Sequence, residues 1–327
     1  GPFNNPFGMG ASPVLADGLV LLNCDSESGS FFVAVEQKTG KVRYRLERPD
    51  ATRGFSTPVL FQPAKGGLQA LVAGSLRMSA YEVATGKEVW FVRGLTWQIK
   101  PTPVFGRDTM YILGWAGGAD PGQQEDIPPF AETLNKFDTN KDTKLSPDEL
   151  GDPKIKKAWN DFDLDRDGLL NERDWKAYQA RRSVQNGVLA YRIDRQKEMR
   201  GDVTESHFLW KYQRALPNTP SPLFYQDVVY LMKEGGILTS LDPKTGEVLK
   251  QGRLPGALGD YYSSPVGADG KLFTISEEGK VTVNASPQKL TQKTSSDKAA
   301  CSGQKDFHGR YFNPSSALEH LLGSGFR

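Results

Sequence analysis

The stretch AYEVATGKEVW, residues 80–90, has the pattern of a strand, a tight turn and a returning strand. Two looser copies are AVEQKTGKVRY at 34–44 and SLDPKTGEVLK at 240–250. The glycine of each Thr-Gly pair, Gly40, Gly86 or Gly246, suits a turn position with positive φ, which a residue with a Cβ adopts reluctantly. The three copies therefore predict β-hairpins.

A second signature, Ser/Thr-Pro followed by an aliphatic residue, precedes short apolar runs that suit strands. It occurs at residues 12–14, 57–59, 102–104, 221–223 and 264–266, with prolines spaced by 45, 45, 119 and 43. Units of this length, each holding about four short strands, predict a β-propeller. The spacing of 119 exceeds the 45-residue spacing by 74, which predicts an insertion into the third unit. A β-sandwich or barrel is the rival interpretation.

The pattern at Ala80, Thr85, Gly86 and Trp90 resembles the repeat of pyrroloquinoline-quinone-like (PQQ-like) β-propellers. That family includes quinoprotein dehydrogenases and the outer-membrane assembly propeller lipoprotein of Gram-negative bacteria. The resemblance covers roughly residues 10–115 and 187–284. It implies seven or eight blades, of which about five are recognisable here, so we expect part of a larger propeller. The copies depart from the pattern at Glu36, Glu82, Tyr44 and Lys250, and the third copy is reduced to AYRID with Trp210.

Composition excludes several classes of protein. The 327 residues carry a formal charge of +2, which gives no electrostatic footprint for DNA or RNA. Cys24 and Cys301 are far apart and form no CxxC motif. No apolar run approaches the ~18 residues of a membrane span, and the first residues lack the features of a signal peptide. Without an initiator Met, the sequence is expected to be a fragment or a processed form.

The predicted domains are propeller blades over 1–115, a helical insert over 116–186, further blades over 187–285, and a tail over 286–327. Residues 120–186 hold 15 acidic and 11 basic residues, a net charge of −4 against +6 elsewhere. The tail is rich in Ser and Lys, and we expect it to be poorly ordered.

The insert contains two acidic loops of the same design, DTNKDTKLSPDE at 138–149 and DLDRDGLLNERD at 163–174. Calcium prefers six to eight oxygen ligands, and such a loop supplies them from side chains at positions 1, 3, 5, 9 and 12 and from the carbonyl of position 7. These residues are Asp138, Asn140, Asp142, Ser146, Glu149 and Lys144 in loop one, and Asp163, Asp165, Asp167, Asn171, Asp174 and Leu169 in loop two. Both loops resemble the EF-hand.

The flanking residues support a pair of EF-hands. Apolar residues upstream of each loop fall on one helical stripe: Phe130, Leu134 and Phe137, then Ile155, Ala158, Trp159 and Phe162. Leu145 and Leu170 occupy position 8, where paired EF-hands form a short two-stranded contact. An ordinary solvated acidic surface is the alternative. Each loop has one defect: Thr143 replaces the Gly of position 6, and Asp174 replaces the longer Glu of position 12.

Two functions remain open. In the first, the chain is a non-catalytic platform for a protein or polysaccharide partner, with calcium in its insert; in the second, it is a PQQ-dependent dehydrogenase. We favour the platform over the dehydrogenase, because the sequence lacks the adjacent cysteines of the family's alcohol dehydrogenases. A hydrolase is not supported either, because the sequence has no GxSxG motif. No catalytic residue is predicted, PQQ binding is not supported, and no PQQ-binding residue is assigned. The resemblance implies a periplasmic or extracellular location in a bacterium.

Overall fold

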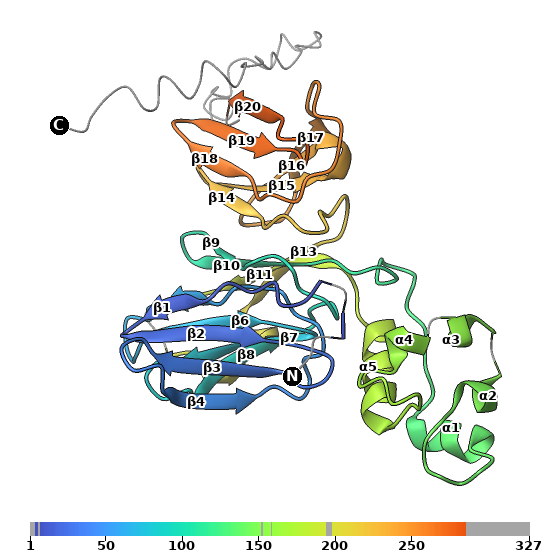
Figure 1. Cartoon of the computed structure of the whole chain (residues 1–327). Coiled ribbons are helices and arrows are strands. Elements are labelled where there is room, and N and C mark those ends of the chain that lie inside the picture. The colour runs from blue at the N-terminus through green and yellow to red at the C-terminus, as the bar shows by residue number, and fades with distance from the viewer. Residues whose placement is uncertain (1–3, 6, 152, 158, 194–197, 286–327) are drawn as a thin grey trace. The chain divides into compact units, whose positions relative to one another are not determined.

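The computed structural model describes residues 4–5, 7–151, 153–157, 159–193 and 198–285. Its strands form five separate sheets (Figure 1). The first four are β1–β4 (Val14–Ala16, Leu19–Cys24, Phe31–Glu36, Val42–Glu47), β5–β8 (Val59–Phe61, Gln69–Ala73, Arg77–Glu82, Glu88–Arg93), β9–β11 with β13 (Val104–Phe105, Thr109–Gly114, Gly187–Arg192, Phe208–Tyr212), and β14–β17 (Leu223–Tyr225, Val228–Lys233, Ile237–Leu241, Val248–Arg253). The fifth is β18–β20 (Val266–Ala268, Lys271–Ile275, Val281–Ala285).

Apart from a short extra strand in the second sheet, each sheet is an antiparallel meander in chain order, as expected for a propeller blade. The fold class predicted from the repeat is confirmed, and since every sheet keeps two edge strands, none closes into a barrel. The first strand of each sheet begins at the aliphatic residue that follows the repeated proline: Val14, Val59, Val104, Leu223 and Val266. Proline cannot donate to a ladder, so it stands just outside the strand.

The predicted hairpins are also present. Gly40 (φ 71°) lies between β3 and β4, Gly86 (φ 76°) between β7 and β8, and Gly246 (φ 75°) between β16 and β17. The Trp90 side chain lies in β8, almost fully buried, and its Nε1–H donates to Gln69 Oε1 at 2.8 Å. This bond satisfies the only polar atom of a large core side chain.

Within residues 1–214, the first three sheets pack on one another through shared apolar cores. Leu21 and Phe32 of the first sheet share a core with Val72 of the second, and Met78 of the second shares another with Ile112 of the third. Burial on both faces explains why the middle strands β6 and β10 read as continuous apolar runs.

The second sheet has a fifth strand that the repeat did not predict. Strand β12, Gly201–Asp202, pairs in parallel with β8 through Gly201↔Trp90 and Asp202↔Phe91. It belongs to the segment between β11 and β13, which also holds helix α6, Thr204–His207. In the third sheet this segment replaces the short Thr-Gly turn that the first, second and fourth sheets have between their last two repeat strands.

The helical insert leaves the third sheet after β10 and returns at β11, and these two strands pair along Thr109↔Arg192 to Gly114↔Gly187. Its helices are α1 Phe130–Phe137, α2 Pro147–Leu150, α3 Pro153–Lys157, α4 Trp159–Phe162 and α5 Glu172–Ser183 (Figure 1).

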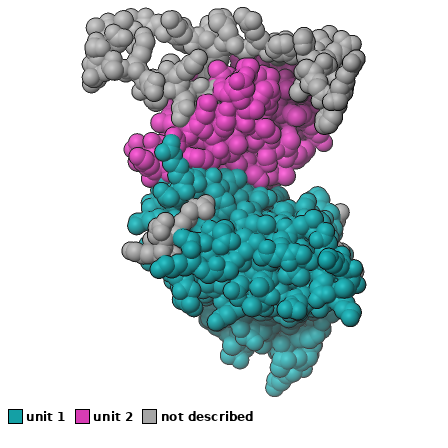
Figure 2. Space-filling model, turned by 90° about the vertical axis from the view of Figure 1, so that its left-hand side faces the viewer, with its two compact units in different colours: residues 1–214 teal, residues 215–327 magenta. Residues whose placement is uncertain are grey.

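The chain divides into two compact units, residues 1–214 and 215–327 (Figure 2). The first holds three sheets and the insert, and the second holds the remaining two sheets. The predicted tail, with Cys301, and the position of Ala158 lie outside the described residues. In the part of the chain that the structure describes, no helix is both long and apolar enough to cross a membrane.

Candidate metal centre

The insert has an apolar core of its own. Leu145, Trp159, Leu170 and Trp175 are buried together, and the predicted stripe residues Phe130, Leu134, Phe137 and Phe162 pack against them. The Trp175 indole N–H donates to the Pro128 carbonyl at 2.8 Å. This core joins the helices that enter and leave both acidic loops, so the two loops are held as one body.

The loops face each other through a single antiparallel pair of residues. Leu145 and Leu170 exchange two backbone hydrogen bonds, with N···O distances of 3.0 and 2.8 Å. Both leucines occupy position 8, the place where the sequence predicted such a contact.

Loop one is closed by its own carboxylates and amide. The Asp138 carboxylate accepts from the N–H of Asp142 (3.3 Å) and of Thr143 (3.0 Å), so position 1 bonds positions 5 and 6. The amide oxygen of Asn140 accepts from the N–H of Asp142 at 2.9 Å, and Asp142 accepts from the N–H of Lys144 at 2.9 Å.

Loop two repeats these bonds position by position. Asp163 accepts from the N–H of Asp167 (3.2 Å) and of Gly168 (2.8 Å). Asp165 accepts from the N–H of Asp167 at 3.3 Å, and Asp167 accepts from the N–H of Leu169 at 2.8 Å. The oxygens at positions 1, 3 and 5 therefore turn toward the inside of a closed backbone curve in both loops.

The carboxylates of position 12 also play one role in both loops. Glu149 accepts from the N–H of Thr139 at 3.0 Å and of Ser146 at 2.8 Å. Asp174 accepts from the N–H of Leu164 at 3.1 Å and of Asn171 at 3.0 Å. These donors are positions 2 and 9 of their loops, and Ser146 and Asn171 cap the following helices in return. The shorter Asp174 thus makes the same two contacts as Glu149.

Two loop positions adopt positive φ. At position 6, Thr143 has φ 67° and Gly168 has φ 88°, so the conformation expected at Thr143 is present. At position 4, Lys141 (φ 60°) and Arg166 (φ 61°) do the same, which sequence reasoning missed. No residue type at position 4 signals this, because both side chains are ordinary surface residues.

Loop two concentrates negative charge. Oxygens of Asp163, Asp165 and Asp174 all lie within 4.8 Å of one another, and Asp163 and Asp174 are only 2% and 1% exposed. Burial raises the pKa of both buried carboxyls. Buried like charges at this distance repel one another unless a cation lies between them. The donor set is all oxygen, so it fits a hard divalent cation.

Loop one differs in its electrostatics. Backbone and side-chain hydrogen bonds from Ser146, then backbone bonds from Thr139 and Asn140, lower the pKa of Glu149 to about 2. The Lys144 ammonium reaches across to Asp167 at 2.7 Å, and this hydrogen bond lowers the pKa of the Asp167 carboxyl. Among the described residues, a cluster of three mutually close acidic groups occurs in loop two alone.

Loop two also contacts the sheets of the first unit, which the sequence did not indicate. The amide of Asn4 donates to the Leu164 carbonyl at 2.8 Å, and Arg173 donates to the Glu27 carbonyl at 2.8 Å. The Arg181 guanidinium stacks over Trp97, 3.9 Å from the ring centroid. These contacts join residues that are 80 or more positions apart, so no local pattern could reveal them.

Comparison with known proteins gives one family match. The family described as "Outer membrane protein assembly factor BamB" matches residues 182–308. Among solved structures, the chain is similar to BamB from Moraxella catarrhalis, with 11% identity, a TM-score of 0.45, and coverage of 85% of this chain and 61% of that one. It is also similar to quinohemoprotein alcohol dehydrogenase from Comamonas testosteroni, with 12% identity, a TM-score of 0.48, and coverage of 94% and 43%. The chain therefore spans less than two thirds of either protein. No curated protein matches the sequence.

Proposed function

Residues 182–308 carry the PQQ-like repeats of β-propeller proteins, and on this premise we infer that the chain is a non-catalytic binding platform whose EF-hand pair holds calcium. Its place is the bacterial periplasm or cell exterior, and its partner is a protein or a polysaccharide. There, calcium in the millimolar range would occupy even weak sites.

The observation that carries the calcium part is the agreement between the two loops. Positions 1, 3, 5 and 12 make matching hydrogen bonds in both, although the residues at positions 3, 6, 9 and 12 differ. An acidic surface without a ligand has no reason to repeat the same inward arrangement of oxygens. In loop two the buried pair Asp163 and Asp174 adds a second reason, because a cation would offset their repulsion.

The proposal that the chain is a binding platform is supported by the family match and by the architecture of the blades. Propeller blades present rigid loops at their ends, and rigid scaffolds commonly carry binding residues on loops. The matched family is described as an assembly factor, which favours a protein partner over a small substrate.

Isothermal titration of the full chain with calcium tests the metal sites. We expect two binding events with dissociation constants of about 10⁻⁴ M, as for extracellular calcium modules. Asp163→Asn should abolish one event, and Asp138→Asn the other. The matched control is Asp269→Asn, which alters an exposed aspartate of the second unit and should leave both events unchanged. No heat of binding at millimolar calcium would show that the loops are solvated surface. The same conclusion would follow if both aspartate substitutions left the heat and the affinity of calcium binding unchanged.

A further inference from the structure

A hollow of about 630 Å³ lies between helix α5 of the insert and the loops of the first two sheets. Its volume falls within the ~300–1,000 Å³ of ligand pockets in proteins. Arg173, Lys176 and Ala180 line it from α5, and Asp50 and Arg93 line it from the sheets. The hollow thus lies where the insert meets the propeller blades of the first unit.

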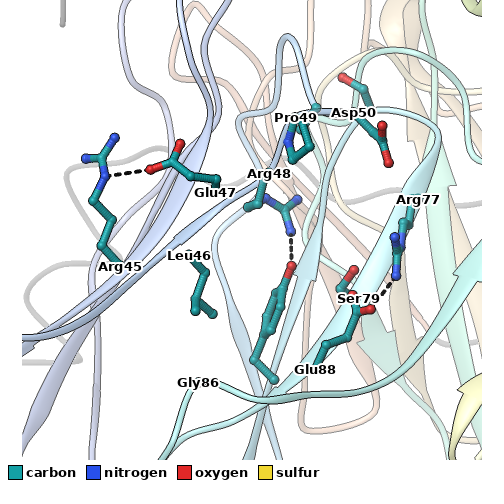
Figure 3. Close-up of a pocket in the computed structure, with 13 residues that line it drawn as sticks. Arg45, Leu46, Glu47, Arg48, Pro49, Asp50, Arg77, Ser79, Gly86 and Glu88 are labelled. Atoms are coloured by element: carbon teal, nitrogen blue, oxygen red, sulfur yellow. Dashed lines mark hydrogen bonds and ion pairs between the residues drawn. The ribbon is translucent and has the colours of Figure 1, made fainter.

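A second hollow, of about 440 Å³, lies beside the first and is the one drawn in Figure 3. The two share Pro49, Asp50 and Arg77, so they form one groove. The second hollow is lined along β4 from Arg45 to Glu47, along β7 by Arg77, Ser79 and Tyr81, and by Glu88 of β8. A groove of this form suits an elongated ligand better than a compact one.

Basic side chains predominate in the first hollow. Four of its lining residues are basic, namely Arg77, Arg93, Arg173 and Lys176, and two are acidic, namely Asp50 and Glu172. In the second hollow the charges balance, with Arg45, Arg48 and Arg77 against Glu47, Asp50 and Glu88, so the acidic side chains of a ligand would lie in the first hollow. The ion pair Arg93–Asp202 has side chains 58% and 45% exposed, and Lys176–Glu172 has side chains 68% and 66% exposed. Such exposed pairs contribute about 0–1 kcal/mol, so both cations can exchange their partners for a carboxylate of a ligand.

The lining also suits a peptide main chain. Ala177, Ala180 and Ser183 are small residues on one face of α5 and leave room beside the helix. The Asp50 carboxylate and the hydroxyls of the lining offer acceptors for backbone N–H groups. Among the described residues that line the two hollows, Tyr81 alone is aromatic, and its side chain is only 7% exposed, whereas sugar rings commonly stack on exposed aromatic faces.

We propose that this groove binds an acidic, extended peptide segment of a partner protein. The proposal rests on the platform function inferred above and gives it a site and a class of ligand. Asn171 and Asp174, which form the capping box at the start of α5, are also predicted ligands of loop two. A calcium ion bound there would add a further constraint on the helix that forms one wall.

The test is fluorescence anisotropy of a labelled eight-residue peptide of alternating Glu and Ser, titrated with the full chain in low salt. Peptides of alternating Lys and Ser, and of alternating Gln and Ser, are the ligand controls. The variant is Arg93→Glu with Lys176→Glu, which reverses two exposed charges. The matched control is Lys271→Glu, which reverses an exposed lysine that is paired with Asp269 in the second unit.

We expect the Glu peptide to bind and the Lys peptide not to bind. The double variant should weaken binding at least about tenfold, equivalent to about 1.4 kcal/mol, and Lys271→Glu should leave it unchanged. Unlabelled oligogalacturonate, an acidic oligosaccharide, is added as a competitor of the Glu peptide in the same assay. Equal binding of all three peptides, an unchanged affinity in the double variant, or displacement of the Glu peptide by oligogalacturonate at a lower concentration than by unlabelled Glu peptide would overturn the proposal.

Calcium titration of the same protein separates the two ideas. If calcium binds and the Glu peptide does not, the groove assignment is wrong and the calcium sites stand. If the peptide binds, the double variant reduces this binding and calcium gives no heat, the groove is a peptide site and the calcium sites are wrong.

Discussion

Single residues set the backbone of the two loops. Thr143 and Gly168 both need positive φ, but only the glycine adopts it without a steric cost. The side chains at position 12 differ by one methylene, yet Glu149 and Asp174 accept from equivalent N–H groups. The defect at position 6 is therefore one of backbone conformation, whereas the shorter side chain at position 12 loses none of these backbone contacts and would differ only in how many oxygens it offers to an ion.

Thr143→Gly should strengthen calcium binding by loop one. A left-handed conformation costs a residue with a Cβ about 1–2 kcal/mol, and an ion-free loop can relax while the ion-bound loop cannot. Removing about 1 kcal/mol corresponds to roughly fivefold in affinity. Isothermal titration of the variant measures this change, with Asp269→Asn in the second unit as the control. An affinity of loop one at or below the wild-type value would contradict the prediction.

Asp174→Glu should strengthen calcium binding by loop two and favour calcium over magnesium. The longer side chain can supply two oxygens to the ion, a geometry that calcium accepts and the smaller octahedral magnesium ion does not. Glu149 shows that a glutamate at this position can reach the same N–H groups. Competition titration with magnesium measures the ratio of the two affinities. A ratio that stays the same, or that shifts toward magnesium, counts against the prediction.

At the scale of elements, the insert depends on one short contact and one shared core. Leu145 and Leu170 pair across the loops, and their side chains are buried with Trp159 and Trp175. Helices α2, α3 and α4 have only four or five residues, too few to be stable alone. Tertiary packing, rather than helix propensity, therefore holds the insert together.

Leu170→Ala should destabilise the insert by about 2–5 kcal/mol, because it leaves a cavity in a closely packed core. Leu170 is 1% exposed. Amide hydrogen exchange over residues 130–183 should rise, while exchange in β6 and β7 should not. Leu258→Ala is the control, since that side chain is 66% exposed. Unchanged protection across the insert would mean that the leucine pair contributes little to its stability.

At the scale of the whole chain, repeated blades determine the architecture. Within the first compact unit the three sheets share apolar cores with their neighbours, and within the second compact unit Tyr230 of β15 and Leu272 of β19 share another. Strand β12 is a local addition to this plan, because it covers the outer edge of β8. An edge strand exposes unpaired N–H and C=O groups that can pair with a strand of another chain. At the two residue pairs of β12 and β8, these groups of β8 are no longer available for such pairing.

We expect the chain to lack PQQ-dependent dehydrogenase activity, because its sequence has no adjacent cysteine pair and offers no recognisable acid and base constellation. The assay is dye reduction after reconstitution with PQQ and calcium, using a panel of alcohols and aldoses and an established quinoprotein as the positive control. Turnover above about 1 per second, the lower end of ordinary enzyme rates, would favour the dehydrogenase over the platform.

The sequence by itself determined the strand starts, the hairpins and the pairing of the loops. These features are local: a proline fixes where a ladder begins, a Thr-Gly pair fixes a turn, and the spacing of oxygens in a 12-residue loop fixes which side chains point inward. Each signal also recurs, and the copies confirm one another. For the same reason, the insertion into the third unit was visible as one long interval between prolines.

Only the tertiary structure decided what the insert touches. The stacking of Arg181 on Trp97, the bond from Arg173 to Glu27, and the groove between α5 and the first two sheets join segments that are distant along the chain. The short strand β12 has no pattern of its own and exists because β8 offers it a free edge. Contacts of this kind depend on where whole elements come to lie, and no local pattern in the sequence specifies that.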